Sequence, residues 1–391
     1  MKVAIINERA EETLGGAERS AFELADALRQ NGLNVDLLAA TGRKTENVKI
    51  LCANKRTGRV GFYAFQKALK KHLEHNHYDI IHSFLPFDFA DIYQPRGGSY
   101  PEAIIRNAAS FQNKFIENFK RLTAFANFRR TTSLRAEKKL CRKKDGPVIA
   151  ALSNYVAQQF IKHYGLDERR IVVIPNGVKT SRLPDAAAAS QIRSQILSNF
   201  GLKNTENAVL FLFAANNFRL KGLSVLLEAF YLAMKKGTNS SSFLVVVGRR
   251  NNQKYFETAK NFGIEKNVAF LKPTDNLQTI SAAADVAVLP TFYDPSSRFI
   301  LEALSIGKPV ITTKYNGATD LFSNNIHGKI IDQPENIEAL AETIIYFTNK
   351  DNIQKASRAI AADNIAQQVS INRAVRQLIS LYETILETKK R

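Results

Sequence analysis

The chain has little of what marks a secreted, fibrous or membrane-spanning protein. Its 391 residues include only two cysteines, so no disulfide framework is expected. The longest apolar runs, such as 208–215, are far shorter than the roughly 20 residues that cross a bilayer. The apolar segment after Lys2 is too short for a signal peptide core and is typical of a first strand. These absences predict a cytoplasmic globular protein.

Several motifs that would assign a chemistry are also missing. There is no G-x-G-x-x-G, no P-loop, no H-E-x-x-H and no C-x-x-C. No Asp-x-Asp occurs, so a common way of holding a divalent metal against a sugar nucleotide is missing. His72, His75 and His77 cluster in the sequence, but no cysteine or convergent acid supports a zinc site there. A solvated helix end is the favoured interpretation, and neither a metal nor a cofactor is expected.

Positive charge is plentiful and concentrated. The 55 Lys and Arg outnumber the 36 Asp and Glu, which gives a net charge of +19. Such a balance indicates an anionic partner: nucleic acid, a membrane face or phosphorylated substrates. Residues 96–144 contain 13 of the cations and only three acids, about half of the excess in one eighth of the chain. The charge is therefore a local feature.

The same stretch carries apolar residues at helical spacing, namely Phe111, Phe115, Phe119 and Leu122. One apolar stripe beside many cations predicts a basic amphipathic helix that lies in a membrane interface. We therefore expect residues 103–144 to dock on anionic lipid, or on phosphorylated glycolipid, without spanning the bilayer. The alternative is that the phenylalanines pack on the N-terminal sheet and the cations are solvated.

Strand and helix signals alternate in both halves of the chain. Near-continuous apolar runs are typical of strands covered on both faces, and in the second half they fall at 208–215, 243–247, 268–271, 286–289 and 309–312. Helical patterns separate them at 223–235, 253–262, 277–283, 298–305 and 337–346. The first half alternates similarly from residue 2 to 174. The pattern predicts an α/β fold of two doubly wound domains.

The domain boundary is expected near residues 178–205. The N-terminal domain would cover residues 1–180, with the basic stretch as an insert at about 101–145, and the C-terminal domain would cover 200–365. The stretch 184–190, with four consecutive alanines, separates the two series. In such folds ligands bind outside the carboxyl ends of the strands.

Four loops after predicted strands carry candidate site residues. Gly15 and Gly16 precede a helix, where backbone N–H groups can meet an anion. Arg219 and Lys221 follow the strongest strand, and two cations there suit a diphosphate. The fourth loop, 174–178, is by itself a turn. Each feature also has a plain structural interpretation as a turn or a solvated loop.

The most informative loop runs from residue 290 into a helix at 298. Asp294 lies in its turn and Glu302 in the helix, and carboxylates in a cleft accept hydrogen bonds from sugar hydroxyls. Backbone N–H groups of Ser296, Ser297 and Arg298 can face a phosphate. The alternative is that Asp294 caps the helix and Glu302 is a surface acid.

Together these loops resemble the retaining glycosyltransferases of family 4, which have the GT-B fold of two facing Rossmann-like domains. The resemblance rests on the opening at residues 15–18, the loops 174–178 and 219–222, and an acid-x7-acid element ending at Glu302. The family pattern is Glu-x7-Glu, whereas this chain has Asp294 first and Ser296-Ser297 in place of Phe-Gly. Among members it most resembles the WaaG-type lipopolysaccharide core glucosyltransferases, because of the basic insert.

The resemblance implies an enzyme, a hexosyltransferase with a nucleotide-sugar donor such as UDP-glucose and a glycolipid or polysaccharide acceptor such as lipopolysaccharide core. It also implies that the N-terminal domain is the acceptor side and that the C-terminal domain holds the nucleotide-sugar donor. The last helix, 371–391, would return to the N-terminal domain. The implied donor contacts are Glu302 on the ribose, Arg219 and Lys221 on the diphosphate, Asp294 on the sugar, and Gly16 on the phosphates. The protein would be peripheral on the cytoplasmic face of the inner membrane.

The sequence leaves open the role of His82 and two alternative functions. His82 ends a predicted strand and is either a contact to acceptor or sugar or a satisfied strand-end histidine. A non-catalytic or nucleic-acid-binding protein using the basic stretch is one alternative, although no nucleic-acid motif occurs and none is expected as a partner. A GT-B sugar-nucleotide epimerase is another.

Overall fold

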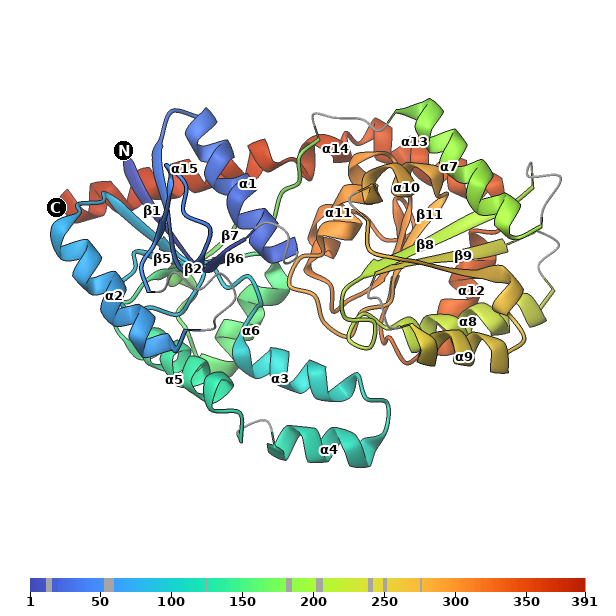
Figure 1. Cartoon of the computed structure of the whole chain (residues 1–391), viewed down its shortest axis with the longest axis horizontal. Coiled ribbons are helices and arrows are strands. Elements are labelled where there is room, and N and C mark those ends of the chain that lie inside the picture. The colour runs from blue at the N-terminus through green and yellow to red at the C-terminus, as the bar shows by residue number, and fades with distance from the viewer. Residues whose placement is uncertain are drawn as a thin grey trace. The chain divides into compact units, whose positions relative to one another are not determined.

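The computed structural model divides into two compact units, which are described separately (Figure 1). Unit 1 comprises Met1–Ala108, Phe115–Gly177 and Ile371–Arg391, and unit 2 comprises Ala109–Lys114 and Val178–Ser370. The structure describes residues 1–11, 16–52, 60–123, 126–180, 185–201, 207–237, 242–248, 252–274 and 276–390.

Unit 1 is built on a parallel sheet of seven strands in the order β3-β2-β1-β4-β5-β6-β7. The order reverses between β1 and β4, so the carboxyl ends of these two strands form the topological switch point. The strands are β1 (Lys2–Ala10), β2 (Asn34–Gly42), β3 (Val48–Ile50), β4 (Ile80–Ser83), β5 (Ile92–Tyr93), β6 (Val148–Ala151) and β7 (Ile171–Val173).

Helices cover both faces of this sheet, which is why β1 and β2 are buried along most of their length. α1 and the C-terminal helix α15 lie side by side on one face and share a core with β1 (Figure 1). α2 packs on the other face. The helices are α1 (Gly16–Gln30), α2 (Phe62–His75), α3 (Tyr100–Ala109), α4 (Lys114–Thr123), α5 (Phe128–Arg142), α6 (Asn154–Tyr164) and α15 (Ile371–Lys390).

Unit 2 repeats the architecture with six parallel strands in the order β10-β9-β8-β11-β12-β13. Its switch point lies between β8 and β11, which pair in parallel. The strands are β8 (Val209–Ala215), β9 (Ser242–Gly248), β10 (Val268–Leu271), β11 (Val286–Leu289), β12 (Val310–Thr313) and β13 (Gly328–Ile331). The two doubly wound sheets predicted from the alternating pattern are therefore confirmed.

The helices of unit 2 surround one continuous apolar core. α8 is buried on most of its surface and packs against α12. The helices are α7 (Ala186–Asn199), α8 (Leu223–Lys235), α9 (Gln253–Asn261), α10 (Leu277–Ala283), α11 (Arg298–Ser305), α12 (Ile337–Tyr346), α13 (Lys350–Ala362) and α14 (Ile365–Gln368), with the 3-10 turn η5 (Gly317–Leu321) after β12.

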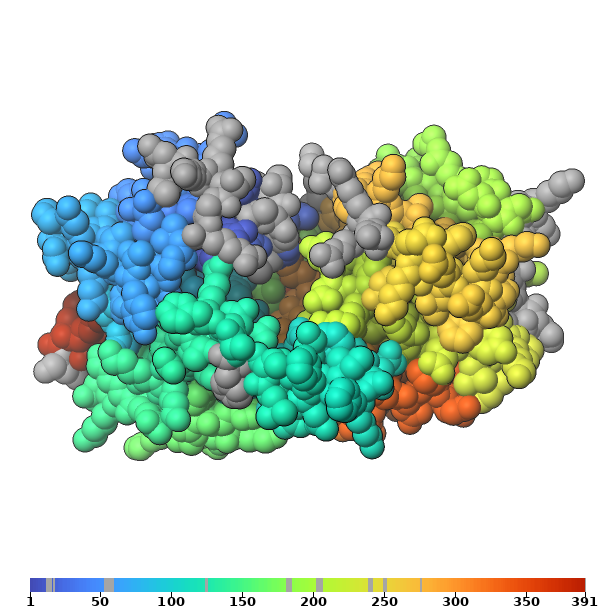
Figure 2. All heavy atoms as spheres, turned by 60° about the horizontal axis from the view of Figure 1, so that its bottom comes forward, coloured from blue at the N-terminus to red at the C-terminus, as the bar shows by residue number. Residues whose placement is uncertain are grey.

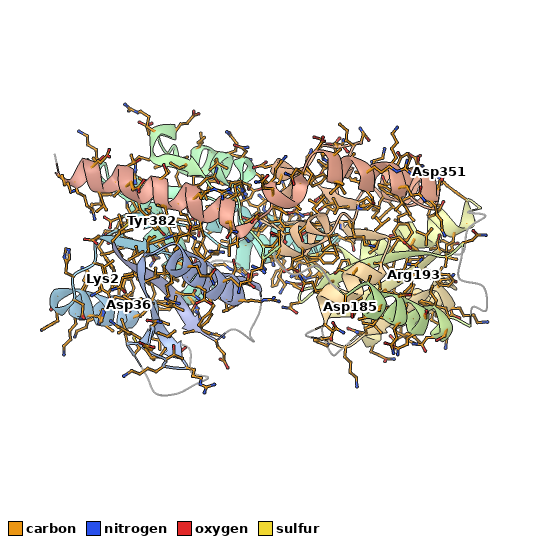
Figure 3. All side chains as sticks on the ribbon, turned by 90° about the horizontal axis from the view of Figure 1, so that it is seen from above. Lys2, Asp36, Asp185, Arg193, Asp351 and Tyr382 are labelled. Carbon is orange, nitrogen blue, oxygen red and sulfur yellow. The ribbon has the colours of Figure 1, made fainter. Side chains whose placement is uncertain are left out.

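The alanine-rich stretch expected to separate the domains is instead the first turn of α7. Asp185 caps this helix by accepting a hydrogen bond from the Ala187 N–H, at 2.9 Å (Figure 3). Alanine has the highest helix propensity, and a preceding Asp satisfies the open N–H groups of the first turn. The chain enters unit 2 earlier, at Val178, whose N–H donates to the Val369 carbonyl at 2.9 Å.

The basic insert also differs from a single amphipathic helix. Phe111 lies in the turn between α3 and α4, where Gln112 has a positive φ of 59° that ends helical geometry. The remaining stripe lies on α4, which has no buried residue. α5, by contrast, buries one of its faces. Among the described residues, no helix is both long enough and apolar enough to span a membrane.

Candidate active site

The loops that follow β8 and β11 meet at the switch point of unit 2. The ammonium group of Lys221 lies 2.7 Å from Oδ2 of Asp294 and donates to the Tyr293 carbonyl at 2.8 Å. Both side chains are mostly but not fully buried, at 20% and 15% exposed. A cation and a carboxylate thus stand together where a doubly wound sheet binds its ligand.

A glycine makes the close approach of these two loops possible. Gly222 has φ +81°, and a Cβ there would lie 2.0 Å from the Pro290 carbonyl oxygen. Only glycine tolerates both conditions. The Phe292 N–H donates to the Leu220 carbonyl at 2.9 Å, which joins the loops beside Lys221.

Asn316 organises the turn that carries Asp294, and sequence reasoning missed it. Its buried Oδ1 accepts from the Ser297 N–H and the Ala318 N–H, both at 3.1 Å. The Gly317 N–H donates to the Asp294 carbonyl at 2.8 Å. An Asn-Gly pair separated from the end of β12 by two residues was the available signal, because such a pair marks a turn.

In the first turn of α11, two of the N–H groups expected to bind a phosphate already donate to other groups of the protein. The Ser296 N–H donates to Asp294 Oδ1 at 3.2 Å, and the Ser297 N–H is held by Asn316. The Ser297 hydroxyl caps α11 by accepting from the Ile300 N–H. The Ser296 hydroxyl is buried and has no hydrogen-bond partner among the described residues. A hydroxyl is therefore available there, whereas the two N–H groups are engaged.

Glu302 lies one turn along α11 from Arg298. Arg298 Nη2 donates to Glu302 Oε1 at 3.0 Å, and the Glu302 side chain is 23% exposed. The carboxylate thus keeps acceptor capacity beyond this bond, because an ionised carboxylate has about four lone-pair sites. Glu302 is held in place and is still reachable from solvent.

Arg219 is partly buried against the segment 109–114, which belongs to unit 2. Its guanidinium donates to the Ser110 hydroxyl and lies 3.8 Å above the centre of the Phe111 ring. Burial lowers the pKa of the Arg219 guanidinium. The planar fork of N–H donors on a guanidinium matches the oxygens of a phosphate, and this one lies on the loop that follows β8.

His82 lies in the interior of unit 1, where it contacts the C-terminal helix. It is fully buried in unit 1, and Nδ1 lies 2.7 Å from the hydroxyl of Tyr382, a residue of α15 (Figure 3). Burial, assisted by the positive charge of Arg96, lowers the pKa of His82 to about 3, so the imidazole is neutral. Only one ring nitrogen is satisfied, however, because Nε2 is buried and has no hydrogen-bond partner among the described residues.

The glycine loop is described only from its second residue. Gly15 lies outside the described residues, and Gly16 is the exposed first residue of α1. One turn further, Ser20 accepts a hydrogen bond from Arg96, and Arg96 also reaches Asn176 Oδ1 at 3.4 Å. One cation of the basic stretch therefore links α1 to the loop 174–178 inside unit 1.

The predicted residues fall into two groups. Seven lie together in unit 2 on the loops after β8 and β11 and on α11: Arg219, Lys221, Asp294, Ser296, Ser297, Arg298 and Glu302. Gly16 and His82 belong to unit 1. No group of three or more His, Cys, Asp or Glu suited to a metal ion occurs in the described part of the chain.

Two family models match the sequence. Residues 14–182 match the model of Glycosyltransferase Family 4, and residues 195–364 match that of Glycosyl transferases group 1. The chain is 24% identical to the lipopolysaccharide glucosyltransferase WaaG of Escherichia coli strain K12 over 286 residues, 72% of this chain and 71% of that protein.

Solved structures resemble the whole chain. The crystal structure of WaaG, a glycosyltransferase involved in lipopolysaccharide biosynthesis, matches with a TM-score of 0.69 at 20% identity, over 99% of both chains. That of Anabaena Alr3699/HepE in complex with UDP-glucose matches with a TM-score of 0.66 at 20% identity, over 97% of this chain and 99% of that one.

These matches, with two doubly wound units, define an enzyme of the glycosyltransferase class with the GT-B fold. The chain carries a Glycosyltransferase Family 4 domain followed by a Glycosyl transferases group 1 domain, and it is a hexosyltransferase. Both expectations drawn from the sequence, the fold and the enzyme class, are confirmed.

Proposed function

We propose that the chain transfers a hexosyl group, with retained configuration, from a nucleotide-sugar donor to a glycolipid or polysaccharide acceptor. The observation that carries this proposal is the Lys221–Asp294 pair at the switch point of unit 2. A similar structure, that of Alr3699/HepE, holds UDP-glucose, which supports UDP-glucose or a close analogue as donor. The similarity to WaaG supports lipopolysaccharide core as the acceptor.

In this proposal five of the seven residues of unit 2 bind the donor, whereas Ser297 caps α11 and Arg298 holds Glu302 in place. Lys221 and Arg219 bind the diphosphate, Asp294 accepts from sugar hydroxyls, and Glu302 accepts from the ribose. The Ser296 hydroxyl, which is buried without a partner among described residues, adds one donor toward the phosphates. A diphosphate that already approaches Lys221 would draw the ammonium away from Asp294, which frees the carboxylate for the sugar.

Catalysis then depends on charge at the leaving group. Breaking the anomeric bond leaves a diphosphate whose growing negative charge Lys221 and Arg219 stabilise, in the role that a metal has elsewhere. We propose that the reaction needs no metal, so EDTA should leave turnover unchanged. A loss of turnover with EDTA that Mg²⁺ restores would contradict this part of the proposal.

The test of donor binding is a thermal-shift panel of nucleotide sugars. UDP-glucose should raise the melting temperature of the wild type and not of Lys221→Ala, because ligands that bind only the folded state stabilise it. No shift with any nucleotide sugar, together with a salt-dependent gel shift on nucleic acid, would favour a nucleic-acid-binding protein. Turnover of UDP-sugar without acceptor would favour an epimerase.

We also propose that α4 docks on anionic lipid at the cytoplasmic face of the inner membrane. Phe115, Phe119 and Leu122 are exposed by 81%, 55% and 78%. Figure 2 shows the segment that contains α4, in blue-green, on the surface. Lys120 and Arg121 on the same helix supply the positive charge. Apolar side chains flanked by cations suit an interface between headgroups and acyl chains.

A further inference from the structure

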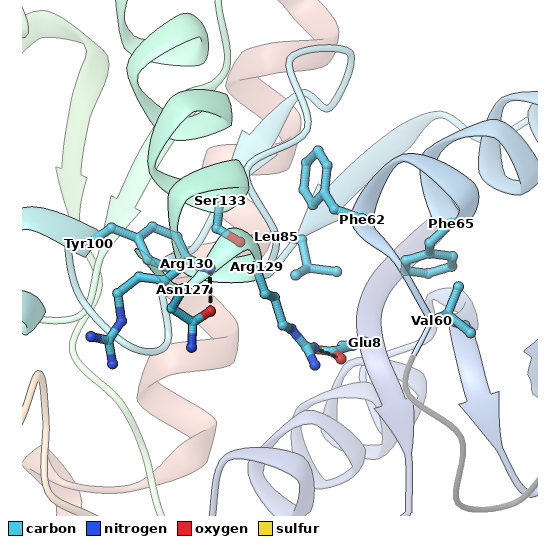
Figure 4. A pocket seen from close by; sticks show the side chains of 11 residues that line it. Glu8, Val60, Phe62, Phe65, Leu85, Tyr100, Asn127, Arg129, Arg130 and Ser133 are labelled. Atoms are coloured by element: carbon cyan, nitrogen blue, oxygen red, sulfur yellow. Dashed lines mark hydrogen bonds and ion pairs between the residues drawn. The ribbon is translucent and has the colours of Figure 1, made fainter. Parts of the chain in front are cut away.

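Unit 1 contains a pocket of about 250 Å³ at its own switch point (Figure 4). Glu8 of β1 and Leu85, just after β4, line it. β1 and β4 occupy the same place in unit 1 that β8 and β11 occupy in unit 2, where the candidate donor residues lie. In doubly wound sheets this position, outside the carboxyl ends of the strands, is the one where ligands bind.

The pocket is lined by apolar residues, which we call the floor, and by polar residues, which we call the rim. Phe62 is held in the floor by stacking on Phe87, with ring centres 4.8 Å apart. The floor consists of Ala40, Val60, Phe62, Phe65 and Leu85, and the rim of Glu8, Tyr100, Asn127, Arg129, Arg130 and Ser133. Aromatic faces fit the C–H faces of a sugar ring, and the hydroxyl and amide groups of the rim suit its hydroxyls.

The charges of the rim favour an anionic ligand. Arg129 donates to Glu8, and the Arg129 side chain is 40% exposed, so most of its five N–H donors remain accessible. The guanidinium of neighbouring Arg130 has no ion-pair or hydrogen-bond partner within the described ranges. Two cations against one carboxylate leave the rim with a net charge of +1.

We infer that this pocket binds one sugar ring that bears a phosphate, with the ring on Phe62 and the phosphate on Arg129. The volume is slightly below the roughly 300–1,000 Å³ typical of sites for drug-sized ligands, so it suits a single substituted ring. The inference rests on the proposed function, in which the phosphorylated sugar is part of the acceptor. The phosphate competes with Glu8 for Arg129.

The chain has no tryptophan, so Phe62→Trp introduces a single fluorescent reporter in the floor. Glucose, galactose and mannose 6-phosphates should each be titrated against this variant, beside the neutral hexoses and inorganic phosphate. At least one hexose phosphate should change the fluorescence saturably and bind at least tenfold more tightly than its neutral hexose and than phosphate alone. Equal binding of phosphate alone, or no binding by any hexose phosphate, would overturn the inference.

Three further substitutions in the Phe62→Trp background, one of them a control, test the charges of the rim. Arg129→Gln should weaken hexose phosphate binding by roughly 10-fold or more, as expected for a hydrogen bond to a charged group. Arg135→Gln removes the same charge from an exposed position of α5 and should have no effect. Glu8→Gln should tighten binding, which a misfolded variant would not do. Equal losses for Arg129→Gln and Arg135→Gln would contradict the pocket.

The same samples separate this inference from the proposed function. The nucleotide-sugar thermal shift tests unit 2 alone, and Lys221→Ala should leave hexose phosphate binding in unit 1 unchanged. Failure of the nucleotide-sugar shift with intact hexose phosphate binding would reject the proposed function and keep the pocket. The converse result would reject only the pocket.

Discussion

The Lys221 ammonium group lies 2.7 Å from the Asp294 carboxylate although 73 positions separate the two residues. The pair joins the loops after β8 and β11, the two neighbouring strands at which the strand order of unit 2 reverses. The ammonium group and the carboxylate are thereby fixed at the carboxyl ends of the strands, where ligands bind, and both side chains are largely buried.

Lys221→Ala should lower the rate of sugar transfer by about 100-fold or more, because the leaving diphosphate loses a preorganised charge. The measurement is kcat with UDP-glucose and a lipopolysaccharide core acceptor. The matched control is Lys236→Ala in the same unit, whose ion pair with Glu338 is exposed. A turnover of Lys221→Ala close to that of Lys236→Ala would contradict the assignment of the diphosphate site.

Glu302→Gln should raise the KM for the donor by roughly tenfold or more, since the ribose hydroxyls lose an ionised acceptor. Steady-state kinetics with varied donor measure this effect. Arg298→Gln removes the ion-pair partner of Glu302 but keeps the carboxylate. If both variants raise KM equally, the pair stabilises α11 and the ribose contact is wrong.

Replacing Phe115, Phe119 and Leu122 by Ser should abolish binding to anionic liposomes, because each buried side chain of this size contributes about 1.5–3 kcal/mol. Co-sedimentation with vesicles that contain phosphatidylglycerol measures it, and added salt should weaken wild-type binding. Phe256→Ser, at a 44% exposed position of α9, is the control. Unchanged binding of the triple variant would reject α4 as the docking helix.

Glu137 should make the stability of the protein depend on pH. It is fully buried on α5, accepts from Tyr93 and Tyr164 at 2.8 and 2.5 Å, and burial raises its pKa from 4.5 to about 7. The folded state then holds its proton more tightly than the unfolded state, so stability falls as pH rises from about 4.5 to 7. The full difference is about 3 kcal/mol.

Urea unfolding at pH 5 and pH 8 tests this dependence. Glu137→Gln should remove most of the loss in unfolding free energy between these values, since Gln does not titrate. Glu74→Gln, at an exposed position of α2, should retain it. Parallel pH profiles for the wild type and Glu137→Gln would show that Glu137 is not the titrating group.

His82→Asn should lower the free energy of unfolding by about 1–3 kcal/mol, through loss of the buried bond to Tyr382. Its kcat, normalised to folded protein, should stay within about twofold of the wild type. Tyr382→Phe removes the same bond from α15 and should destabilise without changing kcat. A large loss of kcat in His82→Asn alone would make His82 a catalytic residue.

The sequence by itself determined the class of fold and the positions of five of the six strands of unit 2. The apolar run at 286–289 coincides with β11, which is buried throughout, because a strand covered on both faces must be apolar along its length. It also located Lys221 and Asp294, since a ligand loop of a doubly wound sheet directly follows a strand. The local sequence pattern indicates which segments are buried and where the chain turns. These two properties were enough to predict the fold class and the loops that carry Lys221 and Asp294.

Only the tertiary structure decided which groups pair. The sequence does not show that Tyr382 closes over His82, 300 positions away, or that Asn316 takes the Ser297 N–H. It also predicted one apolar stripe from Phe111 to Leu122, which the turn at Gln112 divides. Periodicity records that a side chain is apolar or polar, whereas its partner depends on the strand order and on the helices packed across the sheet, which no local pattern contains.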